Sequence, residues 1–163
     1  KYFLTCIDKF SKFAIVQPIP SRTIVDLKPA LMQLMNFFPK AESIYCDNEP
    51  SLNSETVVTM LANNYGVSIS NAPPLHSISN GQVERFHSTL LELARCLKID
   101  KGINDTVEVI LLATTEYNKS IHSVIDQRPV DVVQAHPDEP QEKIRNAQTM
   151  LRAWGDTDPL TCR

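Results

Sequence analysis

The chain has 163 residues, enough for one domain with a hydrophobic core. Apolar residues make up 42% and charged residues 21%, and the four cysteines (Cys6, Cys46, Cys96 and Cys162) have no paired spacing, which favours a reduced intracellular protein without a disulfide framework. No apolar run approaches the length of a membrane span, so we expect no membrane association. The net charge of −3 argues weakly against binding nucleic acid through bulk charge. Such binding would need a local basic patch, divalent metals or segments outside this chain.

Two short apolar runs open the chain and predict a β-hairpin. Residues 2–7 form the first strand, a polar turn follows, and residues 13–19 form its partner. A stripe of apolar residues at steps of three and four then predicts a helix. Because Pro29 would break a helix interior, we expect the regular helix to begin near Leu27, with Asp26 as its N-cap.

The middle of the chain alternates strand and helix. Residues 42–47 predict a strand that ends in an acid, and residues 67–72 predict another. Between them, residues 53–66 predict a helix with Ser54 near its start and Gly66 at its end.

Helices dominate the rest of the chain. After a loop with two prolines, we expect helices at 82–98 and at 104–120, a turn with a short helix within 122–135, and a polar helix at 139–154. The order of elements predicts an α/β layer fold with a mixed central sheet flanked by helices.

Two carboxylates occupy positions typical of a catalytic site. Asp47 ends a predicted strand, and Glu84 lies in the first turn of the helix that follows the next strand and loop. Sites in open α/β sheets form at the carboxyl ends of strands, and converging carboxylates suit a hard divalent cation such as Mg²⁺. Taken singly, each acid also has an ordinary structural explanation, because Asp47 can form a turn and Glu84 can interact with the helix dipole.

The segments around these acids resemble a known family. The stretches "CDNEPSLNS" and "HSISNGQVERFHSTL", with 36 residues between Asp47 and Glu84, resemble the integrase catalytic core of retroviruses and long-terminal-repeat retrotransposons, most closely the Gypsy type. "YFLTCIDKFSKFA" is similar to the second and third strands of that family, and "HSVIDQRPVDVV" to a later segment. The resemblance covers residues 1–135, which leaves residues 136–163 as a C-terminal helix and tail.

The resemblance implies an RNase H-like fold and transfer of polynucleotides, with three carboxylates holding two Mg²⁺ or Mn²⁺ ions. It implies 3′-end processing and strand transfer on DNA, with element ends and target DNA as partners. It also implies a homo-oligomer, action in the nucleus and element particles in the cytoplasm. Asp47 and Glu84 would be the catalytic metal ligands, while His76, Asn80, Gln82, Arg85 and His87 would contact DNA.

The third metal ligand is not evident in this chain. Asp8 matches an aspartate of the family's hairpin, and we interpret it as a turn former that accepts backbone N–H groups. The family's first ligand lies on a strand before this segment, so we expect the first strand to be absent here, which leaves it open whether the chain is an enzyme. Glu49 replaces the family's glycine, and we interpret it as solvent-exposed rather than as a substitute ligand.

Two functions therefore stay open. The chain is either the catalytic core of a retrotransposon integrase or a domesticated or decayed integrase-like domain that binds nucleic acid or protein without catalysis. An upstream strand that carries an aspartate in the parent reading frame would distinguish the first from the second.

Overall fold

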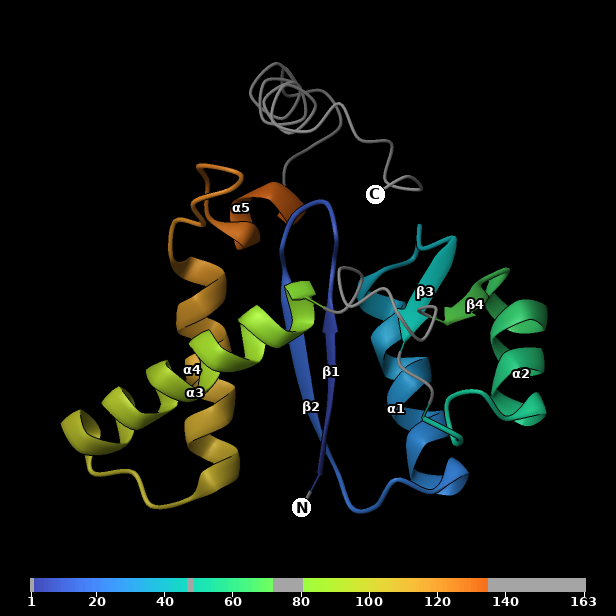
Figure 1. Ribbon diagram of the computed structural model, residues 1–163, viewed down its shortest axis with the longest axis horizontal. Coiled ribbons are helices and arrows are strands. Elements are labelled where there is room, and N and C mark those ends of the chain that lie inside the picture. Colours follow the sequence, from blue (N-terminus) through green and yellow to red (C-terminus); the bar gives the residue numbers. More distant parts are fainter. Residues whose placement is uncertain (1, 47–48, 72–80, 135–163) are drawn as a thin grey trace.

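The computed structural model describes residues 2–46, 49–71 and 81–134. Figure 1 shows a central β-hairpin with helices on both sides. In chain order the elements are β1 (Tyr2–Ile7), β2 (Ala14–Ile19), α1 (Ile24–Phe37), β3 (Ser43–Cys46), α2 (Glu55–Tyr65), β4 (Ser68–Asn71), α3 (Gly81–Lys101), α4 (Thr106–Lys119) and α5 (Pro129–Gln134).

The predicted elements that fall on these residues are confirmed in type and order. Ser54 caps α2 by accepting a hydrogen bond from the backbone N–H of Val57, and Gly66 ends it with a positive φ of 66°. Asp105 caps α4 by accepting hydrogen bonds from the backbone N–H groups of Val107 and Glu108. The polar helix predicted at 139–154 lies outside the described residues.

The predicted start of the first helix is wrong. α1 begins at Ile24 after the N-cap Thr23, and Pro29 lies inside it. The N–H that Pro29 lacks would have bonded to the carbonyl of Val25, whose side chain is 80% exposed. We infer that water can reach this solvent-facing part of the helix and satisfy the free carbonyl, so a helix interior tolerates the proline here.

The hairpin separates two hydrophobic cores. β1 and β2 pair antiparallel, with Ile7 opposite Ala14 and Cys6 opposite Ile15. Because successive side chains of a strand point to opposite faces, Ala14 and its neighbours on one face pack against α3 and α4, while Cys6 and Ile19 pack with α1 and α2. Figure 1 shows the same division, with α3 and α4 on one side of the hairpin and α1, α2, β3 and β4 on the other.

The antiparallel and parallel strand pairings of the predicted mixed sheet are both present, but they lie in two separate sheets among the described residues. β3 pairs parallel with β4, and no ladder joins these strands to the hairpin in the described part of the chain. β1 and β3 therefore each have an edge without a strand partner among the described residues. None of the described helices is long and apolar enough to span a membrane.

Candidate active site

The structure describes four of the seven predicted site residues. Gln82, Glu84, Arg85 and His87 lie in the first two turns of α3. The others lie outside the described residues: Asp47, His76 and Asn80. The convergence of Asp47 with Glu84 therefore stays a prediction, and the geometry of the site is built from the residues around them.

Glu84 is presented to solvent by a helix that is anchored on its other side. Phe86 is buried against α4, where its ring meets the ring of Tyr117 edge to face at 4.7 Å between centroids. Leu90 and Ala94 continue this buried stripe along α3. Glu84 is exposed, and its carboxylate has no hydrogen bond or ion pair within the described residues. Its oxygens are thus accessible to a ligand.

The start of α3 is fastened to the tip of the hairpin. The Gln82 side chain donates a hydrogen bond to the backbone carbonyl of Asp8 at 3.3 Å and accepts one from Lys12 Nζ, also at 3.3 Å. Lys12 adopts a positive φ of 62° in the turn, and its ammonium also donates to the carbonyl of Lys9. Gln82 therefore positions the first turn of α3, and its predicted contact with DNA would require it to exchange these bonds.

The interpretation of Asp8 as a turn former is confirmed. Its carboxylate accepts hydrogen bonds from the backbone N–H and the hydroxyl of buried Ser11 at 2.7 and 2.5 Å. Its backbone carbonyl accepts the N–H of Lys12 as the turn closes. Although Asp8 lies next to Gln82, its carboxylate is committed to the turn rather than directed to a metal site.

Glu49, two residues after Asp47, is held near the first residue of β1, at the end of the strand opposite Asp8. Its carboxylate pairs with Arg22 at 3.3 Å, and the Arg22 guanidinium lies 5.5 Å from the centre of the Tyr2 ring. Tyr2 begins β1, whereas Asp8 follows its last residue. The Glu49 side chain is 27% exposed, which corrects its interpretation as a solvent-exposed acid, because the pair with Arg22 partly covers it.

Positive charge collects around the hairpin tip, which sequence reasoning missed. The pKa of the Lys12 ammonium is lowered mainly by burial and further by the charges of Lys9 and Arg85, against a raising effect of Asp8. The pKa of His122, in the loop after α4, is lowered mainly by burial and then by Lys12 and Arg85. No sequence signal links Lys12 to Gln82, since 70 positions separate them.

The carboxylates suit a hard divalent cation, because Mg²⁺ and Mn²⁺ prefer oxygen ligands. Within the described residues no group of three or more His, Cys, Asp and Glu side chains is placed to hold a metal. Glu84 is an exposed carboxylate in the first turn of α3, and Asp47 directly follows the last residue of β3. These two are the residues that would hold a cation.

The comparisons with solved structures agree with this architecture. The chain superposes on a simian T-cell lymphotropic virus intasome chain with a TM-score of 0.72, at 16% identity over 83% of this chain and 49% of that one. It superposes on the HTLV-2 integrase catalytic core domain in complex with magnesium with a TM-score of 0.67, at 18% identity over 80% and 82% of the two chains. The fold is that of a retroviral integrase catalytic core, which is RNase H-like.

Sequence relatives narrow this class. The chain is 60% identical over 157 residues to the retrovirus-related Pol polyprotein from transposon gypsy of Drosophila melanogaster, over 96% of this chain and 15% of that polyprotein. It is 40% identical over 132 residues to the Pol polyprotein from transposon opus of the same organism, over 81% of this chain and 13% of that polyprotein. The chain is thus a homologue of the gypsy and opus Pol polyproteins, and spans a small part of their length. No protein-family model matches it.

Proposed function

We propose that this chain is the catalytic core of a retrotransposon integrase that processes and joins DNA ends. The observation that carries this proposal is the placement of Glu84, an exposed and unpaired carboxylate among the described residues, in the first turn of an anchored α3. The homology to the gypsy Pol polyprotein and the integrase-core fold support it.

Asp47 and Glu84 would hold Mg²⁺ or Mn²⁺, and a bound pair of metals would neutralise phosphate charge and activate the attacking oxygen. The chain's own part is positional. Buried Phe86 keeps the first turn of α3 in place, while Gln82 ties that turn to the hairpin. Glu49, two residues after Asp47, pairs with Arg22 and so links this part of the chain to the residues before α1.

We further propose that a strand outside these residues lies between β1 and β3 and supplies the third carboxylate. The support for this proposal is that both strands have an unpaired edge within the described residues, and unpaired backbone groups are costly when buried. We also propose that the protein acts as a homo-oligomer, in the nucleus, where its target DNA would be. The HTLV-2 core has been solved in dimeric and trimeric forms.

The test is joining of labelled element-end DNA to a plasmid with Mg²⁺, carried out with three proteins. The first is the 163-residue chain, the second includes the parent reading frame upstream, and the third is the longer protein with Glu84→Gln. We expect joining only by the second, because glutamine keeps the shape of Glu84 but loses the charge that binds a cation. Joining by the Glu84→Gln protein would show that this ligand is misassigned. DNA binding without joining by any of them would favour a non-catalytic domain.

A further inference from the structure

Positively charged side chains from two distant segments meet at the tip of the hairpin. Lys9 and Lys12 belong to the turn between β1 and β2, and Arg85 lies in the second turn of α3. Lys12 Nζ donates to Gln82 Oε1 at 3.3 Å. Gln82 and Arg85 are three positions apart and so share a face of α3. The hydrogen bond to Gln82 therefore holds Lys12 of the hairpin beside Arg85 of the helix.

These cations are not neutralised by acids within the described residues. The ion pairs there join Arg22 to Glu49 and Arg128 to Asp131, so Lys9, Lys12 and Arg85 belong to none of them. Asp8 is the acid whose charge acts on Lys12, and its carboxylate already accepts two hydrogen bonds from Ser11. The cluster therefore keeps a local positive charge although the chain as a whole is negative at −3.

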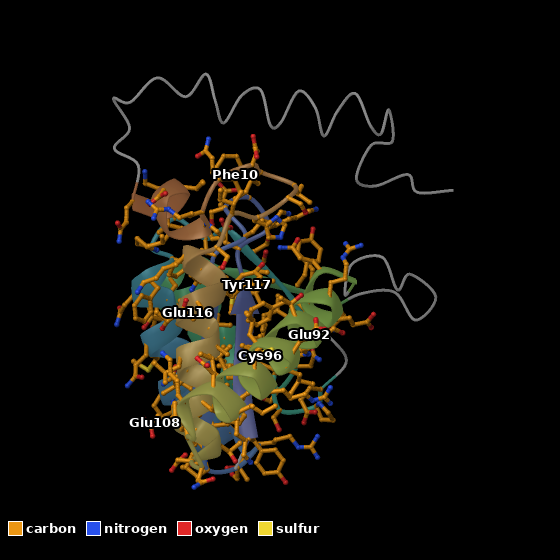
Figure 2. All side chains as sticks on the ribbon, turned by 90° about the vertical axis from the view of Figure 1, so that its left-hand side faces the viewer. Phe10, Glu92, Cys96, Glu108, Glu116 and Tyr117 are labelled. Atoms are coloured by element: carbon orange, nitrogen blue, oxygen red, sulfur yellow. The ribbon has the colours of Figure 1, made fainter. Side chains whose placement is uncertain are left out.

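The exposed surface at this tip suits a polymer more than a free anion. Lys9 and Arg85 are exposed, and Phe10 between the two lysines is 44% exposed. Figure 2 shows Phe10 at one end of the described part of the molecule, with Glu92 on α3 and Glu108 on α4 well away from it. An aromatic ring among cations is a common arrangement for nucleic-acid binding, since the ring can lie against a sugar or base while the cations contact phosphates.

We propose that Lys9, Lys12 and Arg85 form a binding site for the phosphates of a nucleic-acid backbone. This proposal rests on the proposed function and adds to it a contact surface at the hairpin tip. Lys9 and Arg85 bind phosphate directly. Lys12 does so from a position set by Gln82 and the carbonyl of Lys9, which fixes the hairpin and α3 relative to one another.

The experiment measures binding of the 163-residue chain to fluorescently labelled duplex DNA by anisotropy, in EDTA and over a series of KCl concentrations. The test variant is Lys9→Gln with Arg85→Gln. The matched control is Lys98→Gln with Lys101→Gln, which removes the same charge from exposed positions at the far end of α3. We expect the test variant to bind DNA more weakly. The slope of the logarithm of its association constant against the logarithm of the salt concentration should be less steep by about 2, while the control changes little. Equal effects of the two variants would overturn the proposal.

Two further arms complete the test. Lys12→Arg should retain binding and Lys12→Met should weaken it, provided that both have the thermal midpoint of the wild type. Loss of binding in Lys12→Arg despite a wild-type midpoint would contradict direct phosphate contact. Inorganic phosphate at matched ionic strength should displace DNA poorly, and strong displacement would assign the site to free phosphate instead.

This measurement is independent of the joining assay because EDTA removes divalent metals. If the upstream-extended protein fails to join DNA while the salt slope still differs between the test variant and the wild type, the binding site stands and the proposed function fails. If joining depends on Glu84 while the slope is unchanged in the test variant, the proposed function stands and the binding site is wrong.

Discussion

Asn118 on α4 binds the backbone of Ala14 on β2 through both ends of its side-chain amide. Its Oδ1 accepts the Ala14 N–H at 2.9 Å, and its Nδ2 donates to the Ala14 carbonyl at 2.8 Å. Both residues are buried, and Ala14 lies at the first position of β2. The amide therefore acts as a neighbouring strand would, satisfying a backbone edge that a helix packs against.

We expect Asn118→Ala to lower the free energy of unfolding by about 2–6 kcal/mol, because two buried backbone groups at Ala14 lose their partners at about 1–3 kcal/mol each. Urea denaturation measures this change. Asn63→Ala, on the exposed face of α2, is the control and should cost less than about 1 kcal/mol. A loss below 1 kcal/mol in Asn118→Ala would mean that water replaces the amide.

The pair of Arg22 and Glu49 should contribute little to stability. Its side chains are 64% and 27% exposed, so solvent screens the attraction. In a double-mutant cycle with Arg22→Gln and Glu49→Gln, we expect a coupling energy of about 0.5 kcal/mol that shrinks in high salt. A coupling above about 2 kcal/mol would instead indicate a desolvated pair.

His122 should make stability depend on pH. Its pKa is lowered from 6.5 by burial first, and then by the positive charges of Lys12 and Arg85. The unfolded chain therefore binds this proton more readily than the folded protein does. Stability from this group is complete above about pH 6.5 and is lost as the pH falls from there towards the lower folded pKa.

The measurement is the free energy of unfolding at pH values of about 7.5 and 5.5. We expect the free energy of unfolding to fall less between these two pH values in His122→Gln than in the wild type. Equal falls in the wild type and His122→Gln would contradict the assignment.

The cysteines should differ in reactivity. Burial, and then the charge of Asp8, raise the pKa of the Cys6 thiol to about 12, so at pH 8 only about one thiol in 10,000 is ionised. Cys96 is exposed on α3, as Figure 2 shows. We expect iodoacetamide to modify Cys96 in the folded protein and Cys6 only in urea, as followed by peptide mass spectrometry. Modification of Cys6 at the rate of Cys96 without denaturant would show that β1 opens readily.

Most of the local structure of the described residues could be predicted from the sequence. Two short apolar runs predicted the hairpin, and Ser54 and Gly66 marked the limits of α2, because caps and short strands depend on residues within a few positions. The turn at Asp8 followed from the same logic. The integrase-core fold was predicted from the stretches around Asp47 and Glu84 together, a resemblance that the comparisons confirm.

Tertiary structure decided what depends on residues far apart in the chain. Pro29 inside α1 is tolerated because its turn faces solvent, and the exposure of Val25 is set by how α1 packs on the hairpin. Lys12 meets Gln82, and Asn118 meets Ala14, across 70 and 104 positions. No local pattern encodes such pairs, because they arise only when α3 and α4 pack on the face of the hairpin that carries Ala14.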